Sequence, residues 1–207
     1  MSLVISEKGG GGFAPIPAGT YIAVCCMMVD EGTQKNEKFG NEQQKVRIGF
    51  EIPELTIEVD GEMKPRMISR EYTNSLNQKA TLRKELESWR GKAFTLEELK
   101  GFDLKKIAGA PCMLSVIHYD GADGNARAKI SGIMAMPGGI PKPKLAEPPT
   151  VFEMTDDPEE WIPKLDSLPE WIRNIVKASN EYQAYHLEPP EFTEEPLDED
   201  EIDSLPF

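Results

Sequence analysis

The alternation of hydrophobic and polar positions between residues 13 and 136 predicts a small β domain. Residues 20–29 (TYIAVCCMMV) are apolar on both faces, as in a central strand. Residues 43–54 alternate, and the period of two places on one face Val46, Ile48, Phe50 and Ile52. Residues 55–73 predict a strand, a turn at Asp60-Gly61 and a further strand, whereas 111–136 predict a hairpin that turns within residues 120–125.

A helical pattern interrupts these strands. Leu82, Leu86 and Trp89 follow one another at i, i+4 and i+7, so they form one apolar stripe. Asn74 or Ser75 is the expected N-cap, and Gly91 is placed to end the helix. The sequence Thr-Leu-Glu-Glu from residue 95 is a capping box that predicts a second, short helix.

The order of these elements predicts a mainly β fold. One helix between the third and fourth of several short antiparallel strands suggests a five-stranded OB-like barrel with an inserted helix. A C-terminal helical segment and a disordered acidic tail would follow the barrel. The structural alternative is a generic α+β sandwich.

Composition divides the chain into five parts. Four consecutive glycines end a flexible arm, and a run rich in proline and glycine (PGGIPKPKLAEPP) marks a linker. The last 20 residues contain nine acids and no basic residue, which is typical of disorder. The predicted parts are an arm (1–12), an OB-like nucleic-acid-binding domain (13–136), a linker (137–150), a helical segment (151–187) and an acidic tail (188–207).

Charge is distributed unevenly over the 207 residues. The net charge is −13, but residues 1–144 hold 20 basic and 18 acidic residues, a net of +2. Residues 145–207 hold 3 basic and 18 acidic residues, a net of −15. The negative net charge of the chain therefore comes from its C-terminal part. This charge does not exclude nucleic-acid binding by the near-neutral domain.

Several function classes lack their sequence signals. The chain has no phosphate loop of the GxxxxGK[ST] type, no GxGxxG and no evident Cys–His pair, so we do not expect an enzyme. Three cysteines without a CxxC spacing indicate neither a disulfide framework nor a zinc site. No segment is long and apolar enough to cross a membrane. We expect a cytoplasmic protein without cofactor or metal.

Basic and aromatic side chains interleave along the strands and loops that an OB barrel uses for binding. Single-stranded nucleic acid requires cations along its phosphates and flat side chains for its bases. The alternative for each residue is an ordinary solvated surface. The expected phosphate contacts are Lys35, Lys38, Lys45, Arg47, Arg70, Arg127 and Lys129, and the expected stacking residues are Phe39, Tyr72 and Tyr119.

The C-terminal tip is the most specific signal in the sequence. An acidic run ends in apolar residues, and the terminal phenylalanine offers an aromatic anchor together with its α-carboxylate. A partner with one apolar pocket and a basic rim would capture both. The expected partner-binding residues are Asp200, Glu201, Ile202, Asp203, Leu205, Pro206 and Phe207.

The tip resembles that of bacterial single-stranded DNA-binding proteins, which end in acids followed by Ile-Pro-Phe. It departs from that pattern at Ser204 and Leu205. The middle of the chain is similar to a family of phage- and prophage-encoded single-stranded DNA-binding proteins. The matching residues are Trp89-Arg90-Gly91, Phe94-Thr95, Glu98-Leu99, Gly101 to Leu104, Gly109 and Cys112. This resemblance implies an OB fold that coats single-stranded DNA.

Residues 151–187 carry spaced apolar anchors, among them Trp161 and Trp171. We expect this segment to pack on the barrel, because two exposed tryptophans would be a liability. The alternative is a helix that docks a partner or a second copy of the chain, which would make the protein a homo-oligomer.

The sequence thus predicts a phage-type single-stranded DNA-binding protein. It would coat DNA without strong sequence preference and recruit replication or recombination proteins through its tip. The alternative is an acidic adaptor or host-protein inhibitor with no intrinsic DNA binding. The expected contacts serve RNA as well as DNA.

Overall fold

The computed structural model describes residues 14–36, 40–59, 61–145 and 147–186, and every structural statement below concerns these residues. The expected N-terminal arm and acidic tail lie outside them.

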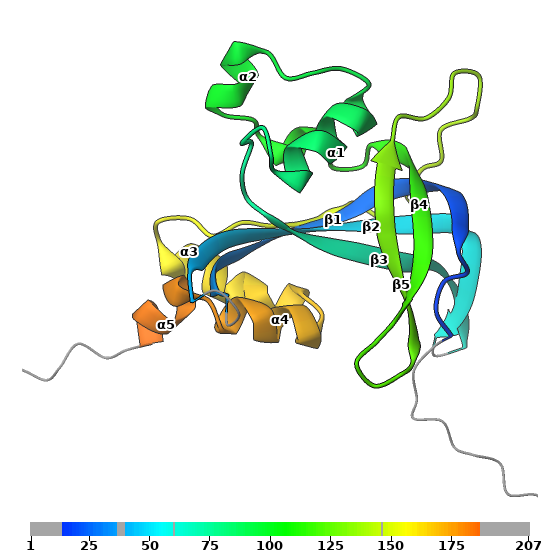
Figure 1. Ribbon diagram of the computed structural model, residues 1–207. Coiled ribbons are helices and arrows are strands. Elements are labelled where there is room, and N and C mark those ends of the chain that lie inside the picture. The colour runs from blue at the N-terminus through cyan, green and yellow to red at the C-terminus, as the bar shows by residue number, and fades with distance from the viewer. Residues whose placement is uncertain (1–13, 37–39, 60, 146, 187–207) are drawn as a thin grey trace, which may run out of the picture.

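The described chain is mainly β and is built on one curled antiparallel sheet (Figure 1). The strand order is β3-β2-β1-β4-β5, and a short strand β6 pairs in parallel with β1. The curl makes the five long strands a half-barrel. The bounds of all six strands are Gly19–Lys35 (β1), Glu42–Val59 (β2), Glu62–Thr73 (β3), Pro111–Asp120 (β4), Ala126–Met134 (β5) and Thr150–Phe152 (β6).

The predicted alternation of β2 is confirmed. Its four apolar side chains from Val46 to Ile52 are buried, and they form the inner core with Leu114 of β4 and Ile130 of β5. Burying an apolar side chain of this size stabilises the fold by about 1.5–3 kcal/mol. This packing orients the residues that alternate with them on β2, among them Lys45 and Arg47, toward the opposite face.

The strands run further than the sequence pattern indicated. The sequence predicts strands over residues 20–29 and 43–54, but β1 runs on to Lys35 and β2 begins at Glu42, because the two strands stay paired as far as Lys35 opposite Glu42. A register shift between Asp30 and Gly32 accommodates the extension, and Gly32 has the positive φ of 68° that favours glycine. Residues 55–59 continue β2 and are not a separate strand.

The helices α1 (Thr81–Arg90) and α2 (Leu96–Lys100) and the 3₁₀ turn η1 (Leu104–Ile107) connect β3 to β4. The stripe Leu82, Leu86 and Trp89 is buried as predicted, and Gly91 ends α1 with a φ of 67°. The predicted capping box at Thr95 is also present.

The expected N-cap of α1 is wrong. The helix begins after Ala80, which makes no side-chain cap hydrogen bond. The Ser75 hydroxyl instead accepts a hydrogen bond from the Asn77 amide at 3.1 Å. A local turn therefore uses this hydroxyl and delays the start of the helix.

The C-terminal segment covers the other face of the sheet. It contains α3 (Pro158–Trp161), the 3₁₀ helix η2 (Ile162–Ser167), α4 (Glu170–Lys177) and α5 (Asn180–His186). Their apolar side chains pack with Met27 and Val29 of β1 in a second core. In Figure 1, α3 to α5 lie below β1–β3, whereas α1 and α2 lie above. The described part of the C-terminal segment is therefore packed on the sheet, as expected from the sequence.

Candidate nucleic-acid interface

Three adjoining hollows follow the C-terminal half of β3. The first, of about 480 Å³, lies between β3 and the β4–β5 hairpin. The second, also about 480 Å³, extends from β3 to the turn before α1, and the third, about 260 Å³, reaches the end of β1. Arg70 and Glu71 line both of the first two hollows, and Lys45 and Glu71 line both of the last two. We call this continuous surface the β3 groove.

The β3 groove is cationic, in contrast to the acidic chain as a whole. Glu71 is the one acidic residue among the described residues that line it. An anionic polymer that follows the groove would meet positive charge in each hollow. The cationic lining residues are Lys35, Lys45, Arg70, Lys79 and Lys129.

A cation and an exposed aromatic ring stand together in the wall of the first hollow. Lys129 on β5 holds its Nζ 5.0 Å from the centroid of the Tyr119 ring on β4. The antiparallel register explains this, because Tyr119 lies opposite Arg127 and Lys129 follows two residues later on the same face. Tyr119 is 40% exposed, so its ring is accessible to a ligand.

Arg70 is held at the point where the half-barrel nearly closes. Its Nη1 donates to Glu85 Oε1 on α1 at 2.5 Å and to the Ile130 carbonyl on β5 at 3.2 Å. Arg70 therefore ties β3 to β5 and to α1 while its partly exposed guanidinium lines the groove.

Tyr72, an expected stacking residue, is buried, and its hydroxyl donates to the Glu85 carboxylate. Burial and the neighbouring carboxylate raise the pKa of this phenol. At 3% exposure its ring is not accessible for stacking on a base.

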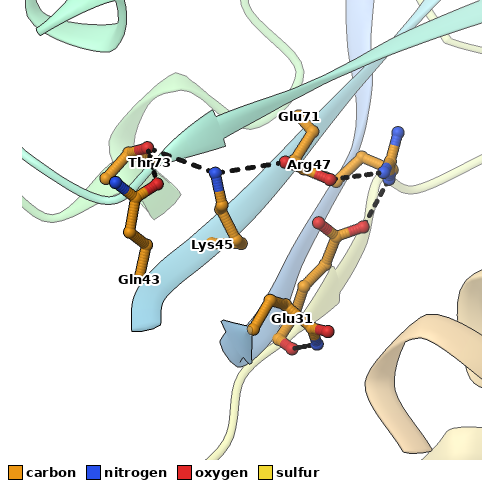
Figure 2. A network of polar contacts seen from close by, with 7 residues as sticks. Glu31, Gln43, Lys45, Arg47, Glu71 and Thr73 are labelled. Carbon is orange, nitrogen blue, oxygen red and sulfur yellow. Dashed lines mark hydrogen bonds and ion pairs between the residues drawn. The ribbon is translucent and has the colours of Figure 1, made fainter. Parts of the chain in front are cut away.

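Lys45 and Arg47 belong to an ion-pair network at the edge of α4 (Figure 2). Arg47 donates through Nε to Glu31 Oε1 at 2.5 Å and through Nη2 to Glu71 Oε2 at 3.5 Å. Lys45 Nζ lies 3.3 Å from Glu71 Oε1 and also 3.3 Å from Thr73 Oγ1. Glu31 is fully buried, and burial raises the pKa of its carboxyl although Arg47 opposes that rise. Arg47 thus compensates a buried charge, while Lys45 also lines the groove.

Arg127 is not among the residues that line the three hollows, although it lies opposite Tyr119 on β5 and interacts with that side chain. Its Nη2 donates to Asp123 Oδ2 at 2.9 Å, within the turn that joins β4 to β5. This hydrogen bond, helped by Asn125, lowers the pKa of the Asp123 carboxyl to about 2. Of the predicted contacts, Lys35, Lys45, Arg70, Tyr119 and Lys129 line the three hollows, whereas Arg47 and Arg127 do not. Lys38, Phe39 and the tip residues Asp200 to Phe207 lie outside the described residues.

Lys79 is a groove residue that the sequence prediction missed. It lies in the turn before α1 and lines the second hollow. No strand pattern or motif distinguishes this lysine from other surface lysines, and only the path of the chain brings it beside β3.

The described residues give little support for other chemistry. They include no group of three or more histidine, cysteine, aspartate or glutamate side chains placed to hold a metal. Burial raises the pKa of the thiols of Cys25 and Cys26 to about 12, which keeps both protonated at neutral pH. The ring of His118 hydrogen-bonds the Ile16 carbonyl at 2.8 Å. None of the helices in the described part of the chain has the length and apolar character that crossing a bilayer requires.

The chain matches no protein-family model and no curated protein sequence. The functional assignment therefore depends on the geometry of the site itself.

Proposed function

We propose that this protein binds single-stranded DNA through the β3 groove with little sequence preference. The observation that carries the proposal is the Tyr119–Lys129 pair in the wall of a groove lined by further cations. A nucleotide presents one flat base and one phosphate, and an exposed ring beside an ammonium group is complementary to both.

We further propose that the half-barrel is of the OB type. The strand order, the approach of β3 to β5 and the helix between β3 and β4 support this assignment. OB folds bind oligonucleotides on the face of their second and third strands and with the loops between strands 1 and 2 and between strands 4 and 5. The position of the β3 groove, with Lys35 at one end and Tyr119 at the other, is consistent with this proposal.

The groove favours a single strand over a duplex. Its cations follow the backbone, and Tyr119 offers a ring that can stack only on an unpaired, accessible base. Stacking tolerates every base, so little sequence preference follows. In the proposed protein, the C-terminal tip recruits replication or recombination proteins to the coated strand.

The test replaces three exposed lysines, one from each hollow. In the variant Lys35→Ala/Lys79→Ala/Lys129→Ala we expect weaker binding of oligo-dT and a salt dependence reduced by about 2 in log–log slope, since each phosphate contact on a single strand contributes about 0.7. Fluorescence anisotropy of labelled oligo-dT at several salt concentrations measures both quantities.

The matched control is Lys64→Ala/Lys92→Ala/Lys100→Ala, which removes the same charge from exposed lysines outside the groove. This control should keep most of the affinity and the wild-type slope. Equal losses in the two triple variants would refute the groove as the binding surface. Absence of binding by the wild-type chain would favour the acidic adaptor.

A further inference from the structure

Trp171 is the one tryptophan that the fold leaves accessible. Trp89 and Trp161 are 6% and 1% exposed and belong to the two cores, whereas Trp171 is 51% exposed. On α4, the side chains of Ile172 and Val176 face the sheet and are buried. Trp171 is one residue before Ile172 on the helix, so its ring lies at the side of α4 and not beneath it.

A charged side chain contacts the Trp171 ring. The Arg47 guanidinium lies 5.0 Å from the centroid of this ring. That guanidinium is itself held by the carboxylates of Glu31 and Glu71. A cation fixed by two carboxylates therefore orients the indole before any ligand arrives, which lowers the entropic cost of stacking on it.

A hollow of about 220 Å³ opens between Trp171 and β3. Met67, 53% exposed, lines it from the strand, and Pro169 and Ile172 line it from the helix side. None of the described side chains that line this hollow is charged. Its lining also includes Ser69, which lines the hollow of Tyr119 and Lys129 as well, so the apolar hollow continues the β3 groove.

We propose that this hollow binds a base of the same single strand, with Trp171 as its stacking residue. The proposal rests on the proposed function and adds a second base position to that of Tyr119. The base carries no charge, and neither do the described side chains that line the hollow, while the adjoining groove supplies the cations for the flanking phosphates. The C-terminal helical segment thus takes part in binding as well as covering the sheet.

The proposal is tested by intrinsic tryptophan fluorescence during titration with oligo-dT, with anisotropy of labelled oligo-dT measured in parallel. Oligo-dT should quench the wild-type emission, and an abasic oligonucleotide of the same length should quench it much less. In Trp171→Phe the fluorescence should no longer respond, because the other two tryptophans are buried. Trp171→Leu removes the aromatic ring and should weaken binding about tenfold.

A second substitution avoids any effect of Trp171 on the stability of α4. Met67→Ser alters the facing wall and should weaken binding severalfold. Met63→Ser, on the same strand and 64% exposed, does not touch the hollow and should bind as the wild type does.

The outcomes separate this inference from the proposed function. Suppose that labelled oligo-dT binds the wild-type chain, that the tryptophan emission of the protein is unchanged, and that Trp171→Leu binds equally well. The proposed base site is then wrong, whereas the proposal that the β3 groove binds the strand is unaffected. If the emission of Trp171 instead shifts with protein concentration in the absence of DNA, the hollow accepts a second copy and the proposal is overturned. If anisotropy detects no binding by the wild-type chain, both proposals fail.

Discussion

Several basic residues of this protein have structural partners as well as a place near the groove. Arg70 ties β3 to β5 and α1, and Arg47 compensates the buried Glu31. Exposed lysines such as Lys79 and Lys129 make no comparable structural ion pairs in the described residues. Substitutions at the two kinds of cation therefore measure different properties, and only the exposed lysines report on ligand binding alone.

Arg47→Ala should destabilise the fold. Glu31 is fully buried, and Arg47 is its partner at 2.5 Å. Removing one member of a buried ion pair leaves an uncompensated charge, so we expect the free energy of unfolding to fall by about 3–5 kcal/mol. Chemical denaturation measures this quantity.

Two comparisons make that measurement specific. Glu31→Gln/Arg47→Met removes both charges and should cost clearly less than Arg47→Ala. Lys64→Ala, in an exposed pair with Glu62, should change stability by no more than about 0.5 kcal/mol. If Arg47→Ala is as mild as Lys64→Ala, the network of Figure 2 does not stabilise the protein as we describe.

At the scale of single elements, the β4–β5 hairpin presents Tyr119 and Lys129, and side-chain hydrogen bonds stabilise its turn. The turn carries a charge-assisted hydrogen bond between Arg127 and Asp123. Arg127 also lies opposite Tyr119 at the start of β5 and interacts with it, so its hydrogen bond to Asp123 competes with any contact that it makes to a phosphate beside that ring.

The Asp123–Arg127 pair makes a prediction for pH dependence. The pKa of Asp123 is depressed to about 2, so the pair stabilises the folded turn above the ordinary pKa of aspartate and this contribution is lost as the pH falls toward 2. In Arg127→Ala the pKa should rise toward 3.8. NMR titration of the Asp123 carboxyl measures the change.

Arg66→Ala is the control for this titration, since Arg66 contacts the Ala14 carbonyl and lies outside the hairpin. It should leave the Asp123 pKa near 2. An unchanged pKa in Arg127→Ala would show that the neighbouring Asn125 hydrogen bonds alone set it.

Local patterns predicted the elements better than their ends. The alternation in β2, the stripe of α1 and the Thr95 capping box are properties of neighbouring residues, and the structure confirms them. The end of β1 depends on long-range pairing with β2, which no local pattern contains. The start of α1 depends on a competing turn at Ser75.

Residues of the candidate site could be predicted from the sequence only where the alternation along a strand determines which way a side chain points. Lys45 and Lys129 alternate with buried residues, so their outward direction follows from sequence. Tyr72 is buried because β3 turns its ring toward α1, where the Glu85 carboxylate accepts a hydrogen bond from its hydroxyl. Lys79 and Trp171 reach the groove through tertiary packing, which a single sequence does not encode in any local signal.

At the scale of the whole molecule, one sheet carries two cores on its two faces. The inner core belongs to the half-barrel and α1, and the second core joins β1 to the C-terminal helices through Met27 and Val29. Removing the helices would expose this apolar surface to water. A shortened chain that tests the acidic tail should therefore retain them and end at His186.

Such a chain lacks residues 187–207, which include nine acidic and no basic residues. We expect these acids to compete with DNA phosphates for the cations of the β3 groove. The shortened chain should bind more tightly than the full chain, and the difference should shrink as salt screens the competition.

The most direct test is a titration of fluorescent oligo-dT with the full chain and with the chain ending at His186, at low and moderate salt and against duplex competitor. We predict salt-sensitive binding that duplex DNA does not displace, and tighter binding by the shortened chain. Absence of binding by both chains, or equal binding of duplex and single strand, would contradict a single-stranded DNA-binding role for the β3 groove.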